Sequence, residues 1–595
     1  MRRENKRKGE NHKMFEIIVK SLKRKKWNIL IDTVFLILNI YLLTIPPKII
    51  GNIIDIMSRD TVDTNVIVQY IFFLLGVSLA NIVCRVIWKY AGTCVQRGFE
   101  RDVKDKLFEH VMKLKLTEMQ KKKNGELMTY FVKDITDIRA FAWRVLAFVP
   151  RILATCIFAI GAMMINVDIK LTIFCMLPLL LSTFVIVKIR KYIDMNFRKA
   201  QKQFTNLSEY VQESTDSIRT TKAYSQEEHQ IEVFKNKNRK LRSSNISVDV
   251  HQNLLNITIQ IAFGISYGIA ILYGGNLVLT DAISVGDFVA FNSYIALFVG
   301  PVSWIPGLLS KWKTAQVAYH RLDDIMQLEK EREGIVTKQG LEDGIQGNIR
   351  ISNLNYHYPE YMDCVLKNIN LDIKQGQTLG IIGTIGSGKT TLMNLLLRLY
   401  PAPRGKITID GRDINDIPIP ILRDNICYIT QDNFLFSDTI KENIKLFKEG
   451  YKDEEIKEST KKAMIYDEIK QMPDSIHTVL AERGGDLSGG QKQRVVISRA
   501  FLNKSNVIIF DDTFSALDNK TEELLMQNIK ELTKGKTCII ISNRISDIKQ
   551  SDHILVLEEG EIIEEGTHDT LLEERGKYYQ FYQEQSVRKE GSILN

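Results

Sequence analysis

The stretch Gly-Thr-Ile-Gly-Ser-Gly-Lys-Thr at residues 383–390 decides the fold of the second half of this chain. Its spacing is typical of a phosphate-binding loop, whose glycines allow positive φ and close backbone approach, so that several N–H groups can point at the phosphates of a nucleotide. The apolar run 378–382 predicts a buried strand before the loop, and residues 391–397 predict a helix after it. A genuine phosphate loop requires this order of strand, loop and helix.

Particular residues of this loop carry the expected chemistry. Lys389 places a positive charge at the β- and γ-phosphates, and the Thr390 hydroxyl can ligate Mg²⁺. A later apolar strand at 507–510 ends in Asp511, which we expect beside the loop, where its carboxylate can hold Mg²⁺ or its bound water. The sequence predicts a site for ATP and Mg²⁺ with these residues on the nucleotide: Gly383, Thr384, Gly386, Ser387, Gly388, Lys389, Thr390 and Thr391.

Two residues outside the loop complete the predicted site. Tyr358 precedes the loop and is placed to stack on adenine, with Tyr356 as the competing choice. Gln431 lies in the segment 428–432 and can contact both Mg²⁺ and the attacking water. We therefore count Gln431 among the catalytic and the metal-contacting residues.

The first half of the chain predicts a membrane domain. The whole chain has 595 residues, of which 45% are hydrophobic, but its long apolar runs lie almost wholly before Leu309. A helix needs about 20 largely apolar residues to cross a bilayer. Six runs in series are hard to bury in a soluble domain of this size, and they lie at 27–43, 66–88, 145–165, 171–187, 254–279 and 288–309.

The basic residues predict the orientation of this domain. The first 26 residues hold eleven Lys or Arg against three Glu, an excess of eight in a chain whose net charge is +9. Segments 89–144 and 188–253 are also rich in Lys and Arg, whereas 280–287 has none. Because such basic loops stay in the cytoplasm, we expect a multi-pass protein of the cell membrane with both termini cytoplasmic. The basic tail could instead bind nucleic acid, but we favour an arm near anionic lipid headgroups and expect no nucleic-acid partner.

These patterns together predict a six-helix, all-α transmembrane domain followed by an α/β P-loop ATPase domain. Helical periodicity continues from the spans into the long cytoplasmic segments, where 124–134 and 216–224 are candidate coupling helices. The expected parts are a basic cytoplasmic segment (1–26), the six-span domain with its coupling helices (27–320), a linker (321–348) and the nucleotide-binding domain (349–595).

A second motif, Leu-Ser-Gly-Gly-Gln at 487–491, lies between the phosphate loop and Asp511. In this order the chain, from about 27 to 583, resembles a half-transporter of the ATP-binding cassette (ABC) exporter family, multidrug-resistance type. The resemblance implies a dimer in which each ATP lies between the phosphate loop of one chain and the signature of the other. It also implies that Asp518 lies in an interface loop and that five signature residues face the partner's ATP: Leu487, Ser488, Gly489, Gly490 and Gln491.

Two positions depart from the family pattern in the hydrolytic site. The family places a Glu after the position of Asp511 to polarise the attacking water, and this chain has Asp512, which is one methylene shorter. The family's His at the γ-phosphate is replaced by Asn543, which has no protonatable ring. Both are catalytic positions, so we expect this chain's own site to bind ATP but to hydrolyse it poorly. Because the signature is intact, we expect a heterodimer with a competent partner site; a slow homodimer is the alternative.

The expected function is ATP-driven export of amphipathic, drug-like small molecules by one half of such a dimer. Lipids or small peptides are alternative cargoes, and a nucleotide-gated membrane regulator that transports nothing is an alternative function. Six apolar runs argue against a soluble cassette ATPase, and the fusion of membrane and ATPase parts argues against an importer. Polar groups within spans usually face the bundle interior, so these residues are candidates to contact cargo: Arg85, Arg151, Asn256, Gln260, Asn292 and Trp304.

Overall fold

The computed structural model describes residues 13–59, 63–122, 124–331, 344–358, 363–515 and 517–593. Their contacts form two units. The first unit holds the described residues up to Leu114 and from Lys121 to Glu329, and the second holds Lys115–Gln120 and the described residues from Lys330 onward. Part of the basic segment and part of the expected linker, residues 1–12 and 332–343, lie outside the described residues.

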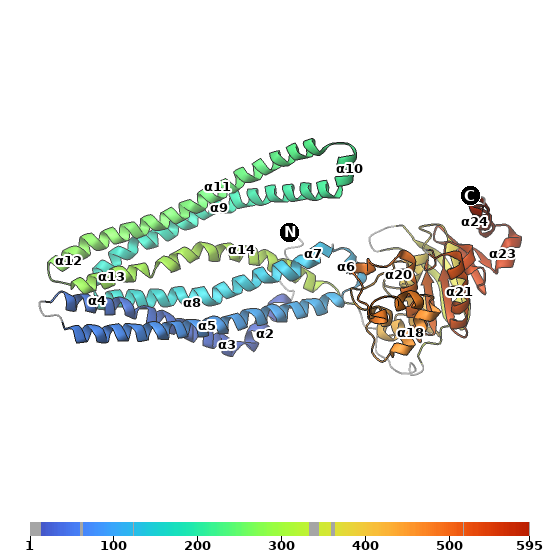
Figure 1. The fold of residues 1–595 in the computed structure, drawn as a ribbon, viewed down its shortest axis with the longest axis horizontal. Coiled ribbons are helices and arrows are strands. Elements are labelled where there is room, and N and C mark those ends of the chain that lie inside the picture. The colour runs from blue at the N-terminus through green and yellow to red at the C-terminus, as the bar shows by residue number, and fades with distance from the viewer. Residues whose placement is uncertain are drawn as a thin grey trace. The chain divides into compact units, whose positions relative to one another are not determined.

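The first unit is helical throughout its described elements (Figure 1). Two short π-helical turns, η2 and η3, interrupt otherwise continuous helices. The elements are α2 (Lys13–Arg24), α3 (Lys26–Leu43), α4 (Ile45–Met57), α5 (Thr64–Met112), α7 (Asn124–Thr129), η2 (Tyr130–Asp134), α8 (Ile135–Asn166), α9 (Ile169–Asp216), α10 (Ile218–Ala223), α11 (Glu227–Ile269), η3 (Ala270–Gly274), α12 (Gly275–Leu279), α13 (Val285–Ala296) and α14 (Val299–Gln327).

The prediction of six apolar helices is confirmed. Many helices run far beyond their apolar parts: at ~1.5 Å per residue, the 49 residues of α5 measure about 70 Å, against ~30 Å for the hydrocarbon core of a bilayer. These helices therefore contain more residues than one crossing of a bilayer requires. The spans cover Lys26–Met57, Thr64–Met112, Gly125–Asn166, Ile169–Asp216, Glu227–Leu279 and Val285–Trp304.

Hydrogen bonds and small residues join neighbouring spans, as is typical of helices that associate in lipid. Asn39 on α3 and Asn81 on α5 each donate a side-chain N–H to the other's backbone carbonyl, at 3.0 and 2.8 Å. Where α4 meets α13, a Cβ on Gly286 would lie 2.0 Å from the carbonyl oxygen of Gly51. The Asp55 carboxylate accepts the Gly286 N–H there at 2.7 Å.

Helices α9 and α11 form a long antiparallel hairpin with α10 at its tip (Figure 1). On this hairpin, the Tyr210 hydroxyl of α9 donates to the backbone carbonyl of Gln230 on α11 at 3.1 Å. Ile218, the first residue of α10, and Tyr224, directly after its last residue, expose 47% and 73% of their surface. The tip therefore presents apolar and aromatic side chains to its surroundings.

The second unit is built on two sheets. A four-stranded antiparallel sheet has the order β2-β1-β4-β5, and a six-stranded sheet has the order β10-β9-β3-β8-β7-β6, in which β10 alone among these strands is antiparallel to its neighbour. The strands are β1 (Ile349–Tyr356), β2 (Leu366–Ile373), β3 (Thr378–Gly383), β4 (Ile407–Ile409), β5 (Arg412–Asp413), β6 (Ile426–Ile429), β7 (Val507–Asp511), β8 (Thr537–Ile541), β9 (His553–Glu558) and β10 (Glu561–Gly566).

Helices surround these sheets. They are α6 (Leu116–Gln120), α15 (Lys389–Leu396), α16 (Ile419–Asp424), α17 (Ile440–Lys445), α18 (Asp453–Lys462), α19 (Tyr466–Lys470), η4 (Ser475–His477), η5 (Glu482–Gly484), α20 (Gly489–Leu502), α21 (Asn519–Leu532), α22 (Ile545–Ile548), α23 (His568–Glu574) and α24 (Lys577–Ile593).

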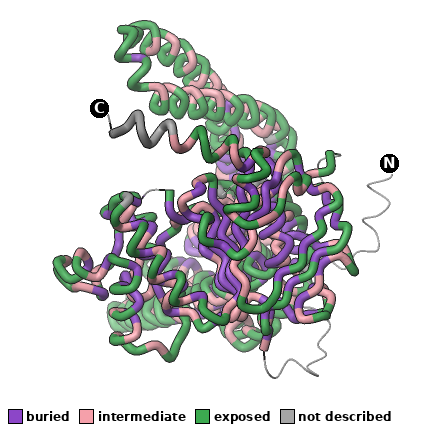
Figure 2. The backbone as a smooth tube through the Cα atoms, turned by 90° about the vertical axis from the view of Figure 1, so that its right-hand side faces the viewer, coloured by how far each residue is buried: buried purple, intermediate pink, exposed green. Residues whose placement is uncertain are grey.

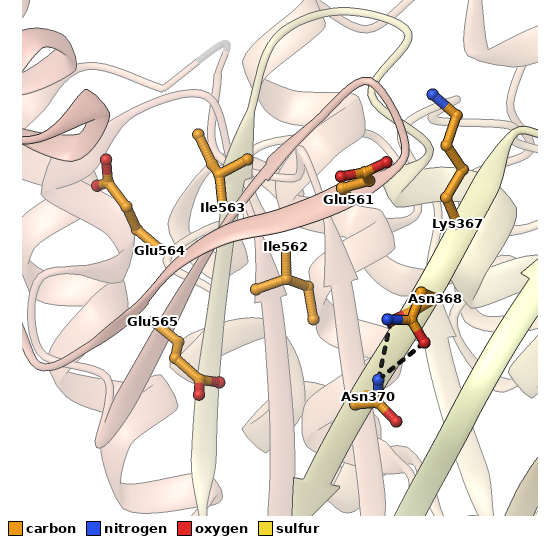
Figure 3. Close-up of a pocket in the computed structure, with 8 residues that line it drawn as sticks. All are labelled: Lys367, Asn368, Asn370, Glu561, Ile562, Ile563, Glu564 and Glu565. Carbon is orange, nitrogen blue, oxygen red and sulfur yellow. Dashed lines mark hydrogen bonds between the residues drawn. The ribbon is translucent and has the colours of Figure 1, made fainter.

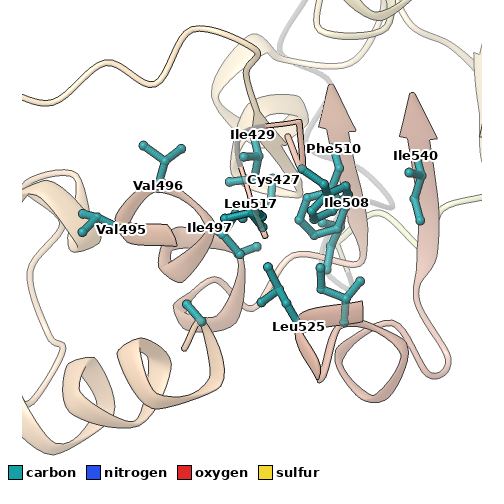
Figure 4. Packing of buried hydrophobic residues seen from close by; sticks show 14 of the residues in the cluster. Cys427, Ile429, Val495, Val496, Ile497, Ile508, Phe510, Leu517, Leu525 and Ile540 are labelled. Carbon is teal, nitrogen blue, oxygen red and sulfur yellow. The ribbon is translucent and has the colours of Figure 1, made fainter. Parts of the chain in front are cut away.

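The core of the second unit lies on both faces of the six-stranded sheet. Strand β7 is buried at every residue, which is why its sequence is a continuous apolar run ending in one carboxylate. Figure 4 shows Val495 and Ile497 of α20 on one side of Ile508 and Phe510 of β7. The central strands β3, β7, β8 and β9 are mostly buried, and Figure 2 shows buried segments running through the middle of this unit. Its central strands are therefore rigid supports for the loops at their carboxyl ends.

Candidate nucleotide site

Three glycines let the phosphate loop turn tightly at the end of β3. Gly386 and Gly388 have φ of 86° and 101°, in the left-handed region that glycine tolerates best. A Cβ on Gly388 would lie 2.7 Å from the Leu366 side chain, and one on Gly383 would lie 2.0 Å from the Leu557 carbonyl oxygen. Helix α15 begins directly after this turn, so its unpaired N–H groups lie at a position suited to an anion.

The Lys389 ammonium folds back over the phosphate loop. Its Nζ donates to the carbonyl oxygens of Gly383 at 2.7 Å and Thr384 at 2.9 Å. Burial lowers the pKa of Lys389, while the charges of Asp511 and Asp512 raise it. This ammonium can exchange its carbonyl partners for phosphate oxygens, whose charge would offset the cost of its burial.

Asp511 lies at the carboxyl end of β7, beside Thr390. It is 3% exposed, and the Tyr428 hydroxyl donates to its Oδ2 at 2.8 Å. Burial raises the pKa of Asp511, whereas hydrogen bonds from Tyr428 and Thr390 and the charge of Lys389 lower it. The Thr390 hydroxyl and the Asp511 carboxylate are thus brought together, and oxygen ligands of these kinds suit Mg²⁺.

Asp512 turns out of the strand toward Gln431. Its φ of 46° is left-handed, which is uncommon for a residue other than glycine, and its N–H donates to the Ile541 carbonyl at 2.8 Å. Gln431 Nε2 donates to Asp512 Oδ2 at 3.2 Å. The structure therefore places two of the predicted catalytic side chains in direct contact.

The third predicted catalytic residue, Asn543, follows the neighbouring strand. Strands β7 and β8 are parallel, with Asp511 opposite Ile541, and β8 pairs in turn with β3, with Ile541 opposite Ile381. The carboxyl ends of these strands meet at one edge of the sheet. Asn543, two residues beyond Ile541, is exposed at that edge.

The two candidate adenine stackers differ in exposure. Tyr356 is 6% exposed and belongs to the core, whereas Tyr358 is half-buried. The Tyr358 hydroxyl hydrogen-bonds Thr391 Oγ1 at 2.9 Å, next to the phosphate loop, and its ring packs edge-on against Tyr400 at 4.9 Å between centroids. Tyr358 therefore has the ring with surface to offer a base.

The signature opens helix α20. Ser488 caps this helix: its Oγ accepts the Gln491 N–H at 3.3 Å, and Gln491 Oε1 accepts the Ser488 N–H at 2.8 Å. Leu487 is buried at 8% exposure. Within the described residues, no hydrogen bond or ion pair links residues 487–491 to the phosphate loop of the same chain. The two motifs do not form one site within a single chain.

Asp518, expected in an interface loop, caps helix α21. Its Oδ2 accepts the Thr521 N–H at 3.0 Å, and this hydrogen bond holds the pKa of Asp518 below its usual value. The residue is otherwise exposed. A local structural role therefore accounts for this side chain within one chain, and its interface role stays a prediction.

Sequence reasoning missed two features near the site. Tyr428, the partner of Asp511, lies in an apolar strand and gave no signal beyond its polar tip. Helix α6 was not singled out either, yet it groups with the second unit: the Tyr400 hydroxyl donates to Gln120 Oε1 at 2.6 Å, and Leu116 packs against the core. The expected coupling segment 124–134 instead runs through α7 and η2 in the first unit.

A separate hollow on the second unit does not coincide with this site. It has a volume of about 400 Å³ and lies between β2 and β10, where Figure 3 shows Lys367, Asn368 and Glu564 among its lining residues. None of the predicted nucleotide-binding residues lines it. The convergent strand ends described above remain the candidate site.

The fold and the site define an ATPase domain of the ABC type joined to a six-span membrane domain. Residues 29–302 match the model of the ABC transporter transmembrane region, and residues 366–515 match the ABC transporter model. The chain is 31% identical over 547 residues to the probable multidrug resistance ABC transporter ATP-binding/permease protein YheI of Bacillus subtilis (strain 168), covering 91% of this chain and 92% of that protein. This chain therefore belongs to the ABC transporter family.

Other relatives agree with that placement. The chain is 31% identical over 484 residues to the ATP-dependent lipid A-core flippase of Syntrophus aciditrophicus (strain SB), covering 81% of this chain and 80% of that protein. Its fold is similar to a bacterial Atm1-family ABC exporter with ATP bound, with a TM-score of 0.79 at 22% identity over 95% of this chain and 99% of that one. The chain is thus an ABC transporter with fused membrane and ATPase domains, and its fold is that of an ABC exporter.

Proposed function

We propose that this chain is one half of a cell-membrane exporter that moves amphipathic small molecules outward at the expense of ATP. The observation that carries this proposal is the convergence of the phosphate loop, Asp511, Asp512, Gln431 and Asn543 at one sheet edge, in a chain with six spans. The multidrug-resistance relatives support the cargo class. Thr390 and Asp511 would hold Mg²⁺, which supplies charge neutralisation at the phosphates.

We further propose that the dimer is asymmetric. In this chain Asp512 is engaged by Gln431, and its short side chain supports weak hydrolysis of the ATP on its own phosphate loop. The capped signature helix α20 supports a role for Ser488 at the ATP of a partner chain. The economical arrangement is a heterodimer whose partner carries the competent base.

Coupling would use the two elements at the ends of the long helices. Helix α6 is held in the second unit by Tyr400, and the exposed tip α10 offers Ile218 and Tyr224 to the ATPase domain of the partner. Closure of the two ATPase domains on ATP would move both elements, and differential affinity of the two membrane states for cargo would turn this movement into export. The basic loops support cytoplasmic placement of both elements.

One cluster within the spans suits an amphipathic cargo. The Arg151 guanidinium of α8 lies 4.6 Å from the Trp304 ring centroid of α14, and Phe148 stacks on the same ring at 5.2 Å. Among the described residues no carboxylate pairs with Arg151. A charge without an ionic partner is energetically costly inside a membrane, so Arg151 and the two aromatic rings beside it are candidates to contact cargo.

Transport by proteoliposomes containing the intact complex tests this proposal. We expect ATP, but not ADP, to drive accumulation of an amphipathic dye, and we expect Trp304→Ala to raise the dye concentration needed for half-maximal transport. Trp312→Ala is the matched control, because Trp312 lies on the same helix beyond the span and packs on Phe141. ATP-dependent ion current without dye movement would favour a regulator instead. ATP-driven movement of lipid or peptide, but of no dye, would favour the alternative cargoes.

A further inference from the structure

We infer that Gln585, on the C-terminal helix α24, is a positioning residue for the loop that carries Asn543. The Gln585 side-chain amide holds this loop at two backbone atoms. Its Nε2 donates to the Asn543 carbonyl at 2.8 Å, and its Oε1 accepts the Ile545 N–H at 2.9 Å. One rigid amide therefore fixes the backbone on both sides of Arg544.

No side chain at the N-cap position of the following helix replaces Gln585, although the Arg544 side chain is itself held by Glu522 at 2.6 Å. Helix α22 begins at Ile545, and its N-cap residue Arg544 makes no side-chain capping hydrogen bond. The first N–H groups of a helix have no partner within the helix and need one from elsewhere. Gln585 supplies that partner for Ile545, while Ser542 Oγ accepts the Arg544 N–H at 3.0 Å.

Helix α24 is anchored firmly enough to act as a fixed arm. Tyr578 in its first turn is fully buried, with its hydroxyl 2.8 Å from His568 Nδ1. Its N–H donates to Glu564 Oε2 at 2.9 Å, and Figure 3 shows Glu564 on strand β10. Gln585 lies seven residues after Tyr578, so both side chains lie on the same face of the helix. The buried tyrosine therefore aims the amide at the loop.

The clamped loop adjoins the nucleotide site. The Ser542 N–H donates to the Ile381 carbonyl of the phosphate-loop strand at 3.1 Å, and the Ile541 carbonyl accepts the Asp512 N–H at 2.8 Å. The inference rests on the proposed function, in which Asn543 meets the γ-phosphate of this chain's own ATP. Through Gln585 the C-terminal helix then sets how well this site distinguishes ATP from ADP.

The test uses the full-length complex in lipid nanodiscs, with a photoreactive ATP analogue crosslinked to this chain and displaced by ATP or ADP. Because Gln585→Ala removes both hydrogen bonds that hold the Asn543 loop, we expect it to lower the preference of this site for ATP over ADP by at least about threefold. Gln583→Ala is the matched control: it lies on the same helix and donates to Tyr579 at 2.8 Å, not to the loop. Gln585→Glu keeps the hydrogen-bond acceptor for Ile545 but loses the donor to Asn543. Its loss of preference for ATP over ADP should therefore lie between that of Gln583→Ala and that of Gln585→Ala.

Repeating the measurement in the Asn543→Ala variant distinguishes a role of Gln585 in positioning Asn543 from a general weakening of nucleotide binding. In Asn543→Ala the γ-phosphate contact is already absent, so Gln585→Ala should cause no further loss of ATP preference. An equal loss in both backgrounds, or no loss with Gln585→Ala alone, overturns the inference. If Asn543→Ala itself changes nothing, the proposed role of Asn543 fails, and hydrogen exchange decides the clamp separately. Faster exchange at the Ile545 amide in Gln585→Ala supports the clamp, and unchanged exchange overturns it.

Discussion

In the proposed asymmetric dimer, Asp512 is the residue that weakens ATP hydrolysis at this chain's own site. Its left-handed backbone turns the carboxylate toward Gln431, which donates to it at 3.2 Å. A general base must reach the water that it activates, and a carboxylate one methylene short and already engaged by an amide is poorly placed to do so. Asn543 at the neighbouring strand end adds no proton-transfer group.

Lengthening these two side chains should restore hydrolysis at this site. In the double variant Asp512→Glu with Asn543→His, we expect the ATPase rate at this chain's site to rise by roughly tenfold or more, since a positioned base contributes about 10²- to 10⁴-fold. The rate at this chain's own site is measured as the hydrolysis of radiolabelled ATP that has been crosslinked to this chain. Glu523→Asp, at an exposed residue of helix α21, is a control that should leave the rate as it is. An unchanged rate in the double variant would show that another feature limits this site.

A buried carboxylate behind Asn543 gives the ATPase domain a pH dependence. Burial raises the pKa of Asp547 to about 6, the nearby Glu522 also raises it, and Ser542 and Arg544 lower it. The ordinary value is 3.8, so between about pH 4 and 6 the folded state binds the proton more tightly than the unfolded state. The free energy of unfolding should therefore fall as pH rises through this window.

Asp547→Asn removes this titration. The variant should lose less stability than the parent chain as pH rises from about 4 to 6, and the two curves should run parallel above that window. The midpoint of thermal unfolding of the ATPase domain, measured at steps of pH, checks this expectation. Parallel curves across the whole range would mean that Asp547 has the same proton affinity in both states.

At the scale of elements, apolar periodicity predicted the spans because lipid demands long, continuous apolar helices. The apolar pattern of the sequence also predicted the central strands of the ATPase domain, for a similar reason. Strand β7 is buried on both faces, and its sequence is therefore one apolar run. Helix α6 escaped notice because five residues show too little periodicity, and its place depends on a distant hydroxyl, that of Tyr400. Contacts between residues far apart in sequence, such as Gln585 with Asn543, leave no local pattern.

The contact between α4 and α13 makes a packing prediction. Gly286→Ala would place a Cβ 2.0 Å from the Gly51 carbonyl oxygen and force the two helices apart. We expect a cost of about 1–3 kcal/mol, which is typical of overpacking, seen as a lower midpoint of thermal unfolding of the membrane domain. Gly268→Ala, where nothing lies within 4 Å of the added Cβ, should be nearly neutral. Equal midpoints for the two variants would contradict the close crossing.

At the scale of the whole molecule, the membrane domain and the ATPase domain differ in where they place their apolar side chains. Leu79, Phe184 and Leu272 expose 65%, 72% and 79% of their surface, as lipid-facing side chains do. The ATPase domain instead buries its apolar residues around a sheet. Sequence motifs predict both the phosphate loop and the signature in this chain, and within the described residues no hydrogen bond or ion pair joins the two motifs. We therefore propose that a partner chain completes each site.

The composition of the proposed dimer is the first property to measure. The complex should be extracted gently from its own membranes, its native mass determined, and any second polypeptide sequenced. We expect a one-to-one complex with another ABC half-transporter that has Glu and His at the positions of Asp512 and Asn543. A complex of two copies of this chain that hydrolyses ATP at an ordinary rate would contradict the asymmetric exporter, because Asp512 and Asn543 would then have to sustain the hydrolysis.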